Sequence, residues 1–149
     1  VKGKRYFEYP SKYYCTDVGL RNIRLGLRQQ EETHIMENLL YNELRVRGYQ
    51  ADVGVVNVTE SNSDGKREQK GLEIDFVAKK GSQMVYIQSA LRMDDIQKQD
   101  SELRSLKAVS DSFQKMVVSK SYGKRWTDEN GILRIGLIDF LLDENCLQG

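Results

Sequence analysis

The chain has 149 residues, of which 39% are hydrophobic and 30% are charged, and this composition is typical of a single globular domain. Its 23 basic and 22 acidic residues leave a formal charge of +1, so the chain as a whole has no bulk attraction for nucleic acid. No apolar run reaches the roughly 18 residues that a bilayer requires, which excludes a membrane-spanning helix and argues against a membrane partner.

The start of the chain is predicted to be a linker. Residues 1–16 contain the only proline, Pro10, and open on a basic stretch without an initiator methionine. We therefore expect the C-terminal part of a longer protein, with residues 1–16 joining a missing upstream domain to the domain at residues 17–149. Cys15 and Cys146 have no metal-binding spacing, and no secretory signal is present, so we expect reduced thiols in a cytoplasmic protein.

A first helix is predicted to begin after Asp17, which can cap it, and to run to about residue 28. Its apolar members are Val18, Ile23, Leu25 and Leu27. Arg21, Arg24 and Arg28 recur at helical spacing, which suits contacts with phosphates of nucleic acid or with acidic residues of an adjoining domain. A solvated helix face is the favoured interpretation of this row.

A second helix, over residues 31–47, has the stronger pattern. Met36, Leu40 and Leu44 recur every four residues, and Gly48 supplies a stop. The apolar face is widened by Ile35, Leu39 and Val46. This width indicates that the helix packs against a sheet.

Three strands are predicted next, at residues 51–58, 72–80 and 84–91. A polar loop over residues 59–70 is expected between the first two. The break at residues 80–82 makes the second and third strands an antiparallel hairpin.

The rest of the chain alternates between helix and strand. Residues 94–109 are predicted to form an amphipathic surface helix, residues 113–119 a strand, and residues 132–142 a strand that runs into a short helix. The predicted fold class is therefore α/β, with a central mixed sheet flanked by helices.

Two acidic residues are expected to converge on this hairpin. Side chains alternate across a strand, so Asp75 and Gln88 become neighbours if the matching faces of the two hairpin strands coincide. Glu37 lies beside the apolar stripe of the second helix and is turned toward the buried side. Because a buried unpaired charge costs several kcal/mol, these acids must be paired, hydrogen-bonded, protonated or metal-bound.

The chain resembles a known group of proteins in four segments. These segments are residues 14–22 (YCTDVGLRN), 37–44 (ENLLYNEL), 71–78 (GLEIDFVA) and 86–88 (YIQ). They look like the domain of unknown function at the C-terminus of many bacterial and archaeal AAA-type ATPases, a degenerate member of the PD-(D/E)XK superfamily with the restriction-endonuclease-like fold. The resemblance implies an upstream ATPase domain in the same chain, which would bind the ATP. No phosphate-binding loop motif is present in the sequence itself.

The resemblance also implies roles for particular residues. Glu37 matches the helix acid, Asp75 the metal-binding aspartate and Gln88 the second acid, while Ala90 falls where the lysine belongs. A glutamine offers Mg²⁺ a carbonyl oxygen without charge, so any Mg²⁺ site, held by Asp75 and Glu37, is expected to be weak. Lys79 or Arg92 could supply a displaced cation, although we favour degeneration of the site over migration of the lysine.

These observations predict an accessory domain rather than a catalyst. The favoured function is a C-terminal domain of an ATPase, with a vestigial nuclease site that binds DNA, RNA or a partner. One alternative is an active Mg²⁺-dependent nuclease that uses Glu37, Asp75 and Gln88. The other is a structural docking domain that regulates the ATPase without touching nucleic acid.

Overall fold

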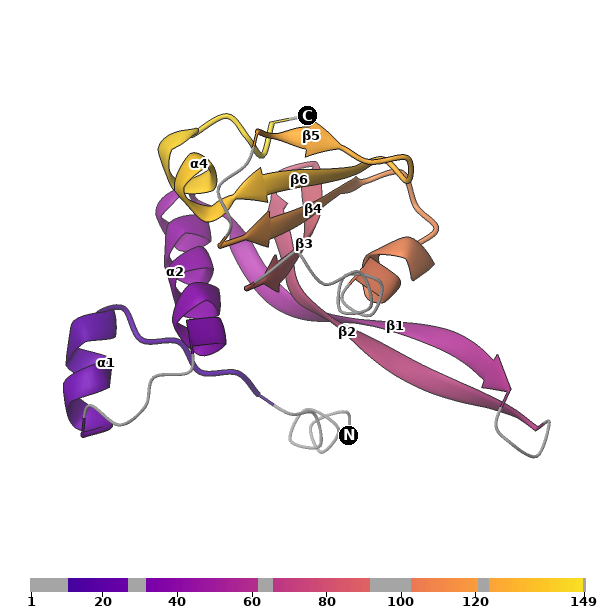
Figure 1. Ribbon diagram of the computed structural model, residues 1–149, viewed down its shortest axis with the longest axis horizontal. Coiled ribbons are helices and arrows are strands. Elements are labelled where there is room, and N and C mark those ends of the chain that lie inside the picture. The colour runs from indigo at the N-terminus through magenta and orange to yellow at the C-terminus, as the bar shows by residue number, and fades with distance from the viewer. Residues whose placement is uncertain (1–10, 27–31, 62–65, 92–102, 121–123, 149) are drawn as a thin grey trace.

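The computed structural model describes residues 11–26, 32–61, 66–91, 103–120 and 124–148. Within these residues six strands form one sheet in the order β1-β2-β3-β4-β6-β5 (Figure 1). The strands are β1 Gln50–Ser61, β2 Arg67–Lys80, β3 Gln83–Ala90, β4 Gln114–Ser119, β5 Trp126–Thr127 and β6 Ile132–Gly136. The helices are α1 Val18–Arg24, α2 Glu32–Val46 and α4 Leu137–Leu142, with a further helical stretch at residues 103–108.

The sheet is mixed, as the sequence predicts. Strands β1, β2 and β3 pair antiparallel, whereas β3, β4 and β6 pair parallel, and the short β5 returns antiparallel to β6. The hairpin expected between β2 and β3 is present, and its turn residue Gly81 has a φ of 59°, which glycine adopts at little cost. The α/β class and the mixed sheet are confirmed.

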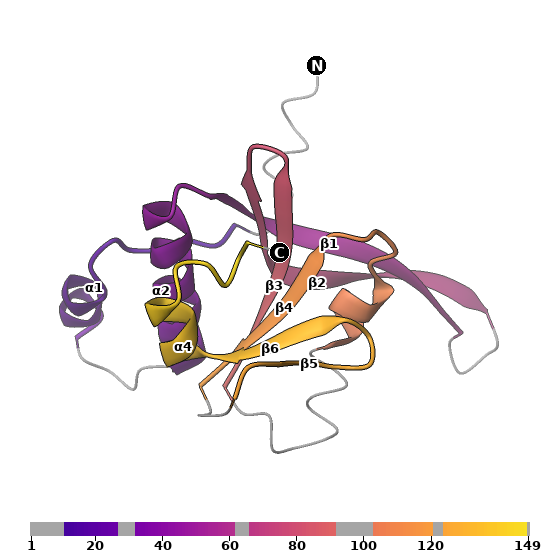
Figure 2. The same cartoon turned by 90° about the horizontal axis from the view of Figure 1, so that it is seen from above.

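Helices cover both faces of the sheet (Figure 2). On one face, α2 and α4 enclose the larger core cluster, in which Leu40, Leu44 and Phe76 are 0% or 1% exposed. On the other face, the stretch at residues 103–108 places Leu103 and Leu106 against Ile74. Successive residues of a central strand therefore enter different clusters, which is why β4 is buried on both sides.

Helix α2 confirms the prediction for residues 31–47, with one exception. Met36, Leu40 and Leu44 are buried, and Gly48 ends the helix with a φ of 81°. Val46, expected on the apolar face, is 82% exposed because it lies on the side of the last turn that leaves the sheet.

Helix α1 begins after Asp17, whose side chain accepts a hydrogen bond from the backbone N–H of Leu20 at 2.9 Å. It ends at Arg24, earlier than expected, and contains no buried residue. Ile23, for example, is 66% exposed. Residues 27–31, and the part of the predicted later helix at residues 94–102, lie outside the described residues.

The polar loop expected over residues 59–70 is wrong. Strand β1 continues to Ser61 and β2 begins at Arg67, so the two form a long arm that projects beyond the body of the domain (Figure 1). Residues 67–71 of β2 are all exposed, so this part of the arm lacks the apolar alternation that would have marked it in the sequence.

A β-bulge interrupts the pairing of β1 with β2 at the base of this arm. Asp52 pairs with Val77 and Gly54 pairs with Ile74, so Val53 stands opposite two residues, Asp75 and Phe76. Ile74 packs under residues 103–108 whereas Phe76 packs under α2. The bulge therefore shifts the alternation of β2 and turns the side chains of both Asp75 and Phe76 toward the α2 face.

No described helix is both long and apolar enough to cross a membrane.

Candidate functional site

Three carboxylates and one lysine meet between α2, β2 and the segment before α1. Lys12 Nζ lies 3.3 Å from Oε2 of Glu37, 3.1 Å from Oδ1 of Asp75 and 2.5 Å from Oε1 of Glu73. The side chains of Glu37 and Asp75 are only 10% and 9% exposed. We call these four residues the lysine–acid cluster.

Helix α2 fixes the segment that delivers Lys12. Asn38 accepts a hydrogen bond from the backbone N–H of Cys15 at 2.9 Å and donates to the carbonyl of Cys15 at 2.7 Å. One turn later, Asn42 donates to the carbonyls of Cys15 and Thr16, each at 3.1 Å. Since residues four apart share one helix face, Asn38 and Asn42 hold residues 15–16 along α2.

Tyr14 packs the same segment onto the core. Its ring stacks on Tyr41 of α2 with centroids 4.5 Å apart and tilts against Phe76 at 5.7 Å. Its hydroxyl donates to Oε2 of Glu37 at 3.4 Å. The segment before α1 is thus anchored by backbone clamps, by stacked rings and by an ammonium group.

Asp75 and its neighbours on β3 exchange hydrogen bonds where the backbone ladder stops. The ladder of β2 and β3 ends at the pair Phe76 and Ile87. Beyond it, Oδ2 of Asp75 accepts from the backbone N–H and the hydroxyl of Ser89, both at 2.8 Å, and Oε1 of Gln88 accepts from the backbone N–H of Asp75 at 3.3 Å. These side chains replace the missing backbone pairing.

Asp75 and Gln88 are neighbours, but the condition from which this was expected, that their side chains share one face of the hairpin, is not met. Ile87 packs under α2, while Tyr86 and Ala90 pack against the opposite cluster. Gln88 alternates with Tyr86 and Ala90, so Ser89 is the residue of β3 whose side chain meets the Asp75 carboxylate. The bulge in β2 is the reason, because the expectation assumed unbroken alternation.

Burial and charge shift the proton affinities in the cluster. Burial, followed by the negative charge of Asp75, raises the pKa of the Glu37 carboxyl above its ordinary value. Burial by itself would lower the pKa of Lys12, but its hydrogen bond to Glu73 and the charge of Asp75 outweigh that effect and raise it. Lys12 therefore stays charged at neutral pH.

The other cations expected at the site lie elsewhere. Lys79 is exposed on β2, four residues beyond Asp75 toward the turn, and Arg92 lies outside the described residues. Arg21 and Arg24 are on the last turn of α1, where Arg21 donates to Asn22 at 3.2 Å, and Arg28 also lies outside the described residues. Among the described contacts, no ion pair joins Arg21 or Arg24 to the three acids.

Sequence reasoning missed Lys12 and Ser89. Lys12 belongs to a stretch without periodicity and lies 63 positions from Asp75, so no local pattern connects them. A signal for Ser89 was available, because a serine in an otherwise apolar buried strand must find a hydrogen-bond partner.

The three carboxylates bind a cation, and this cation is the ammonium group of Lys12 in the same chain. Carboxylate oxygens are also the ligands that Mg²⁺ prefers. The ammonium of Lys12 occupies the space between these oxygens, so the acids as placed here do not fit a metal ion while Lys12 is present.

Comparison with known proteins places the chain in a family. Residues 32–140, which include α2 and both strands of the hairpin, match the family described as a domain of unknown function, DUF4143. The chain belongs to this family. An uncharacterised protein of Haemophilus influenzae resembles this DUF4143 chain with 31% identity over 142 residues, which cover 95% of the chain and 31% of that protein. The chain thus spans about a third of the length of this curated relative. No solved structure matches the chain significantly.

Proposed function

We propose that the domain is a non-catalytic accessory and docking module of a longer AAA-type ATPase, built on a degenerate PD-(D/E)XK site. In this proposal the remaining acids bind the chain's own connector. The main observation in support of this proposal is the position of Lys12, whose ammonium group contacts Glu37, Glu73 and Asp75 at the same time. An acid cluster neutralised in this way holds the segment that leads toward the rest of the longer protein.

The distribution of basic residues supports docking over nucleic-acid binding. A groove for DNA or RNA requires cations that line one surface and track the phosphates. Arg21 and Arg24 lie on α1, which stands apart from the β1–β2 arm in both views (Figures 1 and 2), while Lys79 lies near the hairpin turn. Asp75 is buried under Lys12 rather than open to a phosphodiester.

The test measures ATP hydrolysis by the longer natural protein that carries this domain. Lys12→Met keeps the length of the side chain and removes its charge, so the connector should loosen and the ATP hydrolysis rate should change at least two-fold. Lys79→Met removes an exposed lysine from the same domain and should leave the rate unchanged. Equal rates in all three proteins would contradict the docking role.

A second candidate is an active nuclease. In this candidate Lys12 takes the role of the motif lysine, whose usual position is occupied by Ala90. The observation in its favour is that Lys12 brings an ammonium to within 3.1 Å of Asp75, whereas Lys79 does not approach it. Against it stands the ion pairing of Lys12 with every acid that would have to hold a metal.

Incubation of the purified chain with single- and double-stranded DNA and RNA, with Mg²⁺ or Mn²⁺ present, separates the two candidates. The docking proposal expects no cleavage and no tight binding. Cleavage that disappears in Asp75→Ala and also in Lys12→Met would establish the nuclease.

A further inference from the structure

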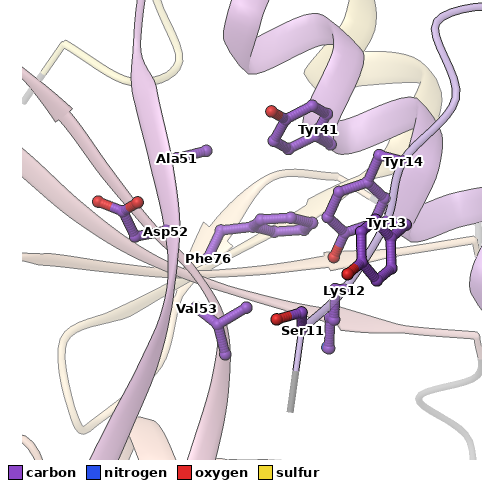
Figure 3. Close-up of a pocket in the computed structure, with 9 residues that line it drawn as sticks. All are labelled: Ser11, Lys12, Tyr13, Tyr14, Tyr41, Ala51, Asp52, Val53 and Phe76. Atoms are coloured by element: carbon purple, nitrogen blue, oxygen red, sulfur yellow. The ribbon is translucent and has the colours of Figure 1, made fainter. Parts of the chain in front are cut away.

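A groove of about 440 Å³ lies between the segment at residues 11–14 and the start of β1. Ala51, Asp52 and Val53 form one side, and the segment with Tyr13 and Tyr14 forms the other (Figure 3). The ring of Phe76 lies between the two sides and forms the floor. This volume falls within the range of about 300–1,000 Å³ that is typical of ligand-binding pockets.

One side of the groove is an unpaired sheet edge. Strand β1 is the end strand of the sheet and pairs only with β2. Among the described residues, no backbone hydrogen bond connects residues 11–14 with Ala51, Asp52 or Val53. An edge strand presents every second N–H and C=O outward, so this edge can accept another strand.

Side chains alternate along this edge in a way that predicts what such a strand carries. Figure 3 shows Ala51 and Val53 directed to the groove side, toward the Phe76 and tyrosine rings, and Asp52 directed to the other side of β1. Phe76 is 1% exposed, so the apolar surface open to an added strand beside this floor comes from Val53, which is 38% exposed, and from Tyr13, which is 91% exposed. Residues of an added strand on this side would lie against these two side chains and should therefore be apolar.

Asp52, which lies between Ala51 and Val53, determines which residue type fits the middle position of the added strand. It is exposed, and its described partner is the amide of Gln50, at 3.5 Å. No described cation pairs with Asp52, and the ammonium of the nearby Lys12 is held by the lysine–acid cluster. Residues opposite each other on neighbouring strands share a face, so a lysine or arginine of the added strand would lie beside the Asp52 carboxylate.

We propose that this groove binds an extended peptide segment of a partner protein, which adds as a strand to the free edge of β1. The segment has the pattern apolar-basic-apolar, with the basic residue opposite Asp52 and the apolar residues against Val53 and Tyr13. Three residues of a strand span about 10 Å, which matches the three residues of β1 that line the groove. Lys12 also lines the groove, whereas Glu37, Glu73 and Asp75 do not, and the proposed peptide site goes beyond the docking function proposed above.

The experiment is a charge exchange, read by fluorescence polarisation with the full 149-residue chain. The probes are two labelled, acetylated and amidated peptides, Gly-Ser-Val-Lys-Val-Ser-Gly and the same peptide with Glu in place of Lys. The unchanged chain should bind the Lys peptide at least five-fold more tightly than the Glu peptide, because a cross-strand ion pair replaces a like-charge pair. Asp52→Lys should reverse this preference.

The matched control is Glu129→Lys, which makes the same charge change at an exposed residue of the turn before β6. This control should keep the preference of the unchanged chain. Amide resonances of residues 51–53 should shift on binding of the Lys peptide. Failure of the Lys peptide to bind the unchanged chain, equal effects of Asp52→Lys and Glu129→Lys, or stronger displacement by oligo-dT than by unlabelled peptide would overturn the proposal.

The acids of the lysine–acid cluster are unchanged in these variants. Because Lys12 also lines the groove, the two proposals are separated by measuring both effects: an unchanged ATPase rate in Lys12→Met with the charge exchange at Asp52 retained contradicts only the docking function, whereas loss of the charge exchange contradicts the groove.

Discussion

Lys12 donates a hydrogen bond to Oδ1 of Asp75 at 3.1 Å, although 63 positions of the chain separate the two residues. Lys12 precedes every helix and strand among the described residues, and Asp75 lies within β2. This contact depends on the tertiary arrangement that brings residue 12, α2 and β2 together. The segment at residues 11–16, expected from sequence to be a linker, is therefore a packed part of the domain.

The first prediction concerns the charge of Lys12. Lys12→Met should lower the free energy of unfolding by about 2–3 kcal/mol, because Glu37 and Asp75 are nearly buried and would lose their cation. Urea denaturation measures this loss. Lys79→Met, at an exposed position of β2, should change the free energy of unfolding by less than about 0.5 kcal/mol. A loss as large as that of Lys12→Met would mean that hydrophobic substitution itself, rather than the ion pairs, causes the effect.

The second prediction concerns the clamp made by Asn38. Asn38→Ala removes both hydrogen bonds to the backbone of Cys15 and should destabilise the domain by about 1–3 kcal/mol, since Asn38 is only 1% exposed. Hydrogen exchange at the Cys15 amide should accelerate more than exchange within β4. Asn57→Ala, on the exposed arm, serves as the control and should alter neither quantity. Unchanged exchange at Cys15 would show that the hydrogen bonds of Asn38 are not what holds the segment.

The regular elements of the domain were predictable because their causes are local. The four-residue spacing of Met36, Leu40 and Leu44 marks a helix with one buried face, and Gly48 supplies the left-handed residue that ends it. Burial of Glu37 beside this stripe follows from the same period. The hairpin of β2 and β3 follows from two apolar runs separated by a glycine turn.

The features that were missed depend on contacts between distant residues. The bulge opposite Val53 cannot be seen in either strand alone, yet it decides that Ser89 rather than Gln88 meets the Asp75 carboxylate. The arm was mistaken for a loop because residues 67–71 of β2 are all exposed and carry no apolar alternation. Lys12 reaches the acids through its position in space, for which the sequence holds no periodic signal.

The third prediction is a pH dependence that originates at Glu37. Burial and the charge of Asp75 raise the pKa of this carboxyl above its ordinary value of 4.5. Because its pKa is higher in the folded state than in the unfolded state, Glu37 contributes stability below pH 4.5 that is lost as pH rises through the folded pKa. The free energy of unfolding of the unchanged chain, minus that of Glu37→Gln, should therefore fall as the pH rises above 4.5.

Urea denaturation of both proteins at each pH gives this difference directly. A difference that increases with pH would mean that attraction to Lys12 outweighs burial and that the folded pKa of Glu37 is lowered. Glu129→Gln, at an exposed turn position, provides the baseline for an ordinary carboxyl.

The fourth prediction tests the bulge through Gly54. A Cβ at this position would lie 2.6 Å from Cγ2 of Val77 and 3.2 Å from Cβ of Ile74, so Gly54→Ala should destabilise the domain by about 1–3 kcal/mol. Adding Val77→Ala removes the nearer contact, so the double variant should lose less stability than the two single losses sum to. Strict additivity of the two free energies would show that the methyl group introduced by Gly54→Ala is accommodated without touching Val77.

The last prediction concerns Arg47, whose guanidinium joins the end of α2 to the C-terminal region. It donates to Oε1 of Glu43 at 2.7 Å and to the carbonyl of Phe140 at 2.6 Å, and it lies over the ring of Phe140 at 4.8 Å. A lysine keeps the charge but cannot make these contacts together, so Arg47→Lys should cost about 1–3 kcal/mol of folding stability.

Arg47 also donates to Sγ of Cys146, a buried thiol whose pKa is raised by burial. Loosening this region should therefore accelerate alkylation of Cys146 by iodoacetamide, while alkylation of the half-buried Cys15 stays the same. Equal acceleration at both thiols would indicate global unfolding instead of a local role for Arg47.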